Sequence, residues 1–163
     1  MSRLDSFIRR LEAQRACIDA AAQTIAALEG PVFELGLGNG RTYDHLRERL
    51  EGREIFVFER QLAAHPACVP DSEHLFLGDI HETLPAAVAR FEGRVALIHS
   101  DIGSGDAEQN AGIAAFLSGN LAKLLRPGGL VISDQPMTLA AADSLALPKG
   151  VKPGRYFIYR RHP

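Results

Sequence analysis

Short apolar runs that alternate with segments of helical periodicity constrain the fold of this chain more than any other feature. The runs lie at Val32–Leu35, Ile55–Phe58, His74–Leu77, Val95–His99, Leu130–Ser133 and Tyr156–Arg161. Apolar residues recur at helical spacing between them, over residues 5–29, 42–50, 84–91 and 106–125. Strands that alternate with helices form parallel βαβ units. The pattern predicts an α/β fold with a doubly wound, mostly parallel sheet and helices on both faces.

The chain length predicts a single domain. Its 163 residues suit one ordinary domain. We expect an N-terminal helix in residues 1–30, a core in 31–135 and a C-terminal segment with the last strand in 136–163. Only Tyr156–Arg161 reads as a strand after the fifth run, so we expect a shortened C-terminal strand pair whose last strand lacks its usual antiparallel neighbour.

Charge and cysteine content exclude several classes of partner. The net charge of −2 gives no general attraction for nucleic acid or for an anionic membrane. Cys17 and Cys68 are too few for a disulfide framework. No stretch has the length of a signal peptide's apolar region or of a membrane span. These observations predict a cytoplasmic protein with no nucleic-acid or membrane partner.

Three glycines, at positions 36, 38 and 40, follow the first apolar run at every second residue. Glycine at the carboxyl end of a strand lets the backbone turn sharply and lets a ligand lie against free amides. A dinucleotide-binding fingerprint would place its third glycine at position 41, where this chain has Arg41. Glu34 adds a negative charge just before the loop, which suits a cationic ligand better than a phosphate.

This segment resembles the first motif of class I S-adenosylmethionine-dependent methyltransferases, an acidic residue followed by G-x-G-x-G. Further acidic residues match the family's marks after the second, third and fourth strands: Glu59, Asp79 and Asp101. The "LLRPGG" segment, Leu124–Gly129, matches the mark before the fifth strand. The resemblance covers residues 30–135 and is greatest to small stand-alone members with no assigned substrate. It implies a Rossmann-like methyltransferase fold with residues 31–135 as the cofactor-binding core.

The resemblance also implies where S-adenosyl-L-methionine is held. It places the ribose hydroxyls on Glu59, the adenine amine near Asp79 and the carboxylate at the amides of the glycine loop. The full set of cofactor-binding residues that we predict is Glu34, Gly36, Gly38, Asn39, Gly40, Thr42, Glu59, Arg60, Asp79, Ile80, Ser100 and Asp101. Turn or strand-end roles remain alternatives for Glu59 and Asp79.

Two residues of the "IHSD" segment are candidate catalytic groups. Asp101 or His99 would remove a proton from an oxygen or nitrogen acceptor. The alternative for His99 is a hydrogen-bonded core residue, and for Asp101 a loop residue. Asp101, Asp134 and Gln135 resemble the metal ligands of catechol-type O-methyltransferases, but Gln135 stands where those enzymes have asparagine. We therefore predict no metal and favour turn or cap roles for these carboxylates.

The resemblance predicts an enzyme that methylates an unidentified small-molecule acceptor. The segment after the fourth strand reads "SDIG" and lacks the N/D-P-P-aromatic motif of nucleobase amino methyltransferases. Two alternatives remain open: a non-catalytic cofactor-binding or scaffold protein, and an NAD-dependent oxidoreductase on the same layered fold, against which Arg41 argues.

Two features favour a homo-oligomer, most simply a two-fold dimer. A last strand without a neighbour would expose a pairing edge. Small residues also form a stripe on one helix, at Gly112, Ala115, Gly119 and Ala122. The stripe predicts close approach either to the sheet or to a partner's helix.

Overall fold

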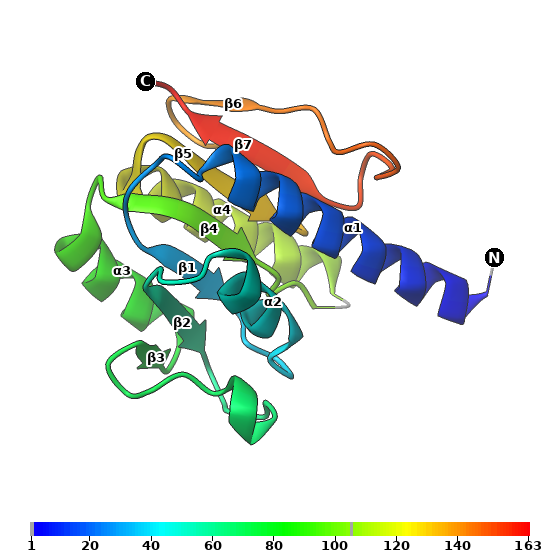
Figure 1. The fold of residues 1–163 in the computed structure, drawn as a ribbon, viewed down its shortest axis with the longest axis horizontal. Coiled ribbons are helices and arrows are strands. Elements are labelled where there is room, and N and C mark those ends of the chain that lie inside the picture. The colour runs from blue at the N-terminus through cyan, green and yellow to red at the C-terminus, as the bar shows by residue number, and fades with distance from the viewer. Residues whose placement is uncertain (1, 105) are drawn as a thin grey trace.

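The computed structural model describes residues 2–104 and 106–163 and contains the predicted alternation of strands and helices (Figure 1). The helices are α1 (Arg3–Thr24), α2 (Arg41–Arg49), α3 (Ile80–Phe91) and α4 (Ala107–Leu124), with a short 3-10 helix η1 (Pro66–Cys68). The strands are β1 (Val32–Leu35), β2 (Ile55–Glu59), β3 (Leu75–Leu77), β4 (Val95–Ser100), β5 (Leu125–Ser133), β6 (Ala142–Ser144) and β7 (Phe157–Arg161).

The seven strands form one mixed sheet in the order β3-β2-β1-β4-β5-β7-β6. Strands β1 to β5 run parallel to one another, whereas β7 runs antiparallel to both β5 and β6. The order reverses at β1, which lies between β2 and β4. In doubly wound sheets the ligand crevice lies at this point, outside the carboxyl ends of the strands.

Apolar residues fill both sides of the sheet. Helices α1 and α2 cover one face, where Ile18, Ile25 and Leu46 are buried against the strands. Helices α3 and α4 cover the other, where Leu84 and Leu117 pack on a cluster of phenylalanines. Strands β1, β2 and β4 are consequently buried on both faces, which explains why they read as continuous apolar runs. The first turns of α1 project beyond the carboxyl edge of the sheet (Figure 1).

Three element boundaries differ from the prediction. Helix α1 ends at Thr24 rather than at residue 29. Helix α3 begins at Ile80, because the Asp79 side chain accepts the backbone N–H of His81 and caps the helix. Strand β5 begins at Leu125, so the glycines that precede its apolar run lie inside the strand, where the register with β4 shifts.

One expectation about an exposed edge was wrong, and one of the two alternatives for the small-residue stripe is excluded. The last strand does not lack a neighbour, since β6 pairs with it from Ala142 to Ser144 and leaves β7 between two strands. The small-residue stripe on α4 does not approach the sheet. A Cβ atom added at Gly112 or Gly119 would meet no atom within 4 Å, and both glycines are exposed.

Among the described residues, no helix has the length and apolar character needed to cross a membrane.

Candidate functional site

The glycine loop turns the chain sharply between β1 and α2. Gly36, Gly38 and Gly40 all have positive φ, at 90°, 53° and 86°. A Cβ atom at Gly36 would lie 2.4 Å from Cγ2 of Ile102, and one at Gly40 would lie 2.4 Å from Cβ of Cys68. A Cβ atom at Gly38 would meet nothing within 4 Å. Two glycines are therefore required by packing, while Gly38 borders open space.

Glu59 ends β2 and turns its carboxylate toward the glycine loop. Its Oε2 accepts the backbone N–H groups of Leu37 and Gly38 at 2.8 and 2.9 Å. Its Oε1 accepts the N–H groups of Arg60 and Gln61. The amides of the loop thus point toward an oxygen acceptor at the carboxyl end of the sheet.

Asp79 lies on the far side of the same crevice, at the start of α3. Its Oδ1 accepts both the backbone N–H and Nδ1 of His81. These hydrogen bonds lower the pKa of Asp79, so the carboxylate remains charged at neutral pH. A turn role is one of the two alternatives for Asp79, and the helix cap is a local role of that kind.

A cleft of about 440 Å³ joins these elements at the carboxyl ends of β1, β2 and β4. The volume is in the range of small-molecule sites. Among the predicted site residues, it is lined by Gly36, Gly38, Glu59, Arg60, Asp79, Ile80 and Asp101. Asn39 and Gly40 belong to the same loop but do not line the cleft, and neither does Ser100, which is buried.

Glu34 and His99 lie inside the protein rather than in the cleft, and both side chains are fully buried. Residues 34 and 99 are register partners on β1 and β4, and Glu34 Oε2 lies 2.6 Å from His99 Nδ1. The second glutamate oxygen accepts the Thr42 hydroxyl, and His99 Nε2 lies 3.2 Å from the Tyr156 hydroxyl. Burial alone would lower the pKa of His99, but the charge and hydrogen bond of Glu34 outweigh it and raise the pKa.

Asp101 lies at the mouth of the cleft and is held by helix α1. Its Oδ1 accepts from Arg10 and its Oδ2 from Gln14, each at 2.6 Å. Its side chain is 16% exposed, which leaves it the more accessible of the two predicted catalytic groups. The projecting α1 helix is therefore tied to the carboxyl edge of the sheet.

Asp134 follows β5 and lies beside Asp101. Burial, followed by the charge of Asp101, raises the pKa of Asp134 to about 6. Its Oδ1 is buried without a hydrogen-bond partner in the described part of the chain. Gly103 packs against it so closely that a Cβ atom there would lie 2.4 Å from Oδ2.

The described residues contain no group of three His, Cys, Asp or Glu side chains placed to bind a metal ion. The structure does bring Asp101 and Asp134 together, but Arg10 supplies the positive charge beside them.

Three residues of this region were not predicted from sequence: Arg10, Gln14 and Tyr156. The first two lie on a helix whose apolar spacing indicates only a packing role. Tyr156 was predicted only as part of an edge strand.

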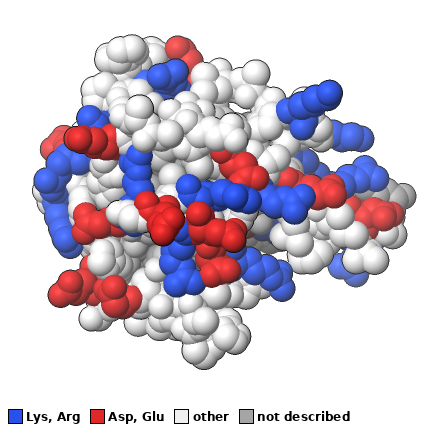
Figure 2. Space-filling view, in the orientation of Figure 1, with Lys and Arg blue, Asp and Glu red and all other residues white. Residues whose placement is uncertain are grey.

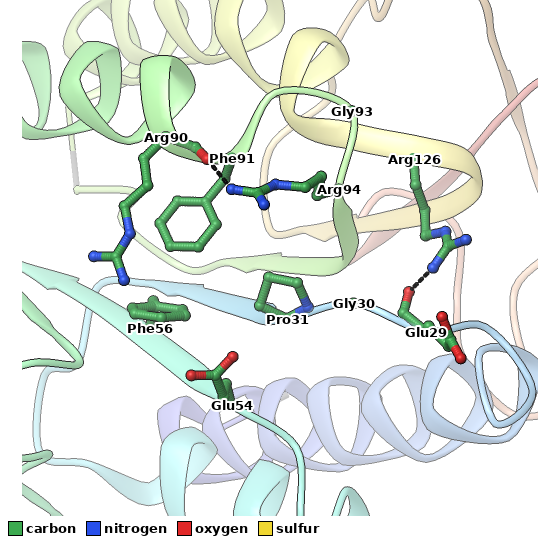
Figure 3. A pocket seen from close by; sticks show the side chains of 10 residues that line it. All are labelled: Glu29, Gly30, Pro31, Glu54, Phe56, Arg90, Phe91, Gly93, Arg94 and Arg126. Atoms are coloured by element: carbon green, nitrogen blue, oxygen red, sulfur yellow. Dashed lines mark hydrogen bonds between the residues drawn. The ribbon is translucent and has the colours of Figure 1, made fainter.

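A second cleft, of about 470 Å³, lies at the opposite edge of the sheet, where the strands begin (Figure 3). Arg90 and Arg94 lie on either side of Phe91 in this view. Arg94 donates to the carbonyl of Arg90 in the last turn of α3, and Arg126 donates to that of Glu29 in the segment between α1 and β1. None of the predicted site residues lines this cleft.

Comparison with protein families identifies the chain. Residues 1–161 match the model of the S-adenosyl-L-methionine methyltransferase family Methyltransf_17. The chain belongs to this family. It is an S-adenosylmethionine-dependent methyltransferase, which decides against the nicotinamide-dependent and non-catalytic alternatives.

A solved structure supports the assignment along the whole chain. An S-adenosyl-L-methionine methyl transferase from Silicibacter pomeroyi DSS-3 is 49% identical to this methyltransferase, with a TM-score of 0.94 and 99% of each chain covered. The comparison with curated proteins gave no match.

Two more distant structures share the fold. Cofactor-bound Rv0187 from MTB is 14% identical with a TM-score of 0.59, and 98% of this chain and 91% of that chain are covered. The 1,6-didemethyltoxoflavin-N1-methyltransferase of Burkholderia thailandensis is 15% identical with a TM-score of 0.51, covering 91% and 80%. Both confirm the Rossmann-like methyltransferase fold.

The residues of the carboxyl-edge cleft fit the family's cofactor. The N–H groups of Leu37 and Gly38 converge on one Glu59 oxygen in this structure, so they would bind a ligand carboxylate only in place of it. Each Glu59 oxygen already accepts two backbone N–H groups, so ribose hydroxyls would have to replace some of these hydrogen bonds. Asp79 can accept an amine. Gly38 leaves the space beside the loop open for close approach.

Proposed function

We propose that this methyltransferase holds S-adenosylmethionine in the carboxyl-edge cleft and methylates a small-molecule acceptor beside Asp101. The observation that carries the proposal is the convergence of the glycine loop, Glu59, Asp79 and Asp101 on one cleft. Thr42, Asn39, Gly40 and Ser100 would support the loop and strand ends from behind the cleft wall.

The cofactor supplies an already activated methyl group. The contribution of the chain is to align the acceptor and exclude water. Glu59 would fix the ribose and Asp79 the adenine. Arg10 and Gln14 would hold the Asp101 carboxylate in one orientation, because each binds a different oxygen.

Asp101 is the better candidate for removing a proton from the acceptor, since its side chain reaches the cleft. His99 has no exposed surface and both ring nitrogens have protein partners. Its proposed role is therefore to position Glu34, which in turn holds Thr42 at the start of α2. Substituting each residue would separate the proton-removing role from the positioning role. Asp101→Asn should reduce turnover more than it reduces cofactor affinity.

The single-domain organisation and the two-fold dimer remain predictions. The exposed stripe on α4 offers a surface for close contact with a partner's helix. Strand β7 offers no free edge for pairing, because β6 covers it. Light scattering at tens of micromolar protein would report the dimer, and a monomer there would contradict it.

Calorimetry with S-adenosylhomocysteine tests the cofactor site. We expect one site per chain and a loss of about 1.5–3 kcal/mol of binding free energy in Glu59→Ala, the scale of hydrogen bonds to a charged group. The matched control is Glu51→Ala, an exposed glutamate outside the cleft. Unchanged affinity in Glu59→Ala would show that the ribose is held elsewhere.

Transfer of labelled methyl groups from S-adenosylmethionine to a panel of metabolites tests the acceptor class. We expect label in a small molecule. Label incorporated only into nucleic acid or protein would contradict the small-molecule proposal.

A further inference from the structure

A groove between α1 and the loop before β7 carries an unbalanced positive charge. One acidic side chain, Glu12, lines it together with five cationic side chains. The cationic residues are Arg9, Arg15, Lys149, Lys152 and Arg155. The chain as a whole has a net charge of −2, so this is a local excess. The groove has a volume of about 390 Å³.

None of the five cations forms an ion pair with an acidic side chain in residues 2–104 and 106–163. In that part of the chain the five side chains make one hydrogen bond, which Arg155 donates to the Ser6 hydroxyl at 3.1 Å. Like charges that share a groove repel one another, and a bound anion relieves that repulsion.

The backbone that carries the two lysines is anchored. Lys149 lies within the turn from Pro148 to Val151, which closes with a 3.1 Å backbone hydrogen bond, and Lys152 follows it. Gly150 has a φ of 91°, and Val151 packs against the core under α1. The walls of the groove are thus a long helix and an anchored turn, so binding would order the cationic side chains but not the backbone.

We propose that this groove is a binding site for a small ligand that carries phosphate. Guanidinium groups bind phosphate oxygens in pairs, and lysine ammonium groups add point charges. Cations that approach from a helix and from a loop surround a tetrahedral group better than a planar carboxylate.

The extent of the charge favours a small ligand over a nucleic acid. A volume near 390 Å³ is that of a small-molecule pocket. Elsewhere on the face shown in Figure 2, acidic side chains are interspersed with basic ones, so no continuous basic track leads away across that face. The site stands independently of the methyl-transfer proposal.

The groove lies next to the carboxyl edge of the sheet. Arg155 contacts Ser6 at the projecting end of α1, and Arg10, one turn later, contacts Asp101. A phosphate-bearing ligand in the groove would therefore lie across the first turns of α1 from the acceptor side of the cleft.

The test is calorimetry of the full chain with inorganic pyrophosphate at constant ionic strength. We expect saturable binding that weakens about tenfold in Arg9→Gln/Lys152→Gln, because two exposed charge contacts are lost. The matched control is Arg90→Gln/Arg94→Gln, which removes the same charge at the opposite edge of the sheet (Figure 3). We expect pyrophosphate affinity there to be unchanged, and S-adenosylhomocysteine affinity to be unchanged in both variants.

Three results would overturn the proposal. They are no saturable pyrophosphate binding, an equal loss in the two double variants, or a short oligothymidylate that binds the groove more tightly than pyrophosphate does. Loss of S-adenosylhomocysteine binding with pyrophosphate binding intact would instead count against the cofactor site alone.

Discussion

Replacing Asp134 by asparagine should stabilise the protein at high pH and leave its stability nearly unchanged at low pH. The raised pKa means that the folded protein prefers the protonated carboxyl group, because the charged form is buried beside Asp101. The unfolded chain has an ordinary value near 3.8 and the folded protein a value of about 6. A favourable contribution is thus fully present below pH 3.8 and is lost as pH rises through 6.

The size of the effect follows from that difference. Each pKa unit corresponds to about 1.4 kcal/mol, so the charged carboxylate costs at most about 3 kcal/mol. Partial exposure of Asp134 screens its charge, which reduces the expectation to about 2 kcal/mol. Asparagine removes the charge at every pH and keeps nearly the same shape.

Urea unfolding at pH 4.5 and at pH 8 measures this contribution. About a third of the penalty is already present at pH 4.5, which lies above the unfolded pKa of 3.8, so we expect Asp134→Asn to gain about 1.3 kcal/mol relative to wild type on moving from pH 4.5 to pH 8. The matched control is Glu51→Gln, an exposed glutamate that forms no ion pair in the described part of the chain and should show little pH-dependent difference. An Asp134→Asn effect of equal size at both pH values would refute the reasoning, since it would show that the charge is not the source.

Three substitutions test the packing behind the cleft. Glu34→Gln leaves His99 without its buried charged partner, so the free energy of unfolding in urea should fall by about 3 kcal/mol or more. A fall below about 1 kcal/mol would contradict the buried pair. Tyr156→Phe removes the hydroxyl that lies 3.2 Å from His99 Nε2 and should lower the free energy of unfolding by about 1 kcal/mol in the same assay. No change within error would show that this hydrogen bond contributes nothing to stability. Gly36→Ala should destabilise the protein by more than Gly150→Ala, because both glycines have φ near 90° but only Gly36 faces an atom within 2.4 Å. Equal thermal shifts would show that backbone strain alone matters.

The centre of the parallel sheet could be predicted from sequence because β1, β2 and β4 are buried on both faces. Each of these three strands is a run rich in apolar residues, and the glycine loop follows the first of them. The antiparallel end could not be predicted in the same way. Strand β6 is only Ala142–Ser144 and half-exposed, so its pairing is set by β7 and not by an apolar pattern.

The cleft residues could be predicted only in part, because their roles depend on contacts between distant segments. Sequence places Glu59 and Asp101 at strand ends, and both line the cleft. It does not show that Arg10 pairs with Asp101, which lies 91 residues later in the chain. It does not show either that register brings Glu34 opposite His99, which buries both side chains.

A crystal structure with S-adenosylhomocysteine tests the cofactor site most directly. We predict that the ribose hydroxyls lie within hydrogen-bonding distance of the Glu59 carboxylate, and that the adenine lies on the Asp79 side of the cleft. Density for the ligand in the α1 groove or at the arginine-lined amino edge, with Glu59 unoccupied by the ribose, would contradict the account.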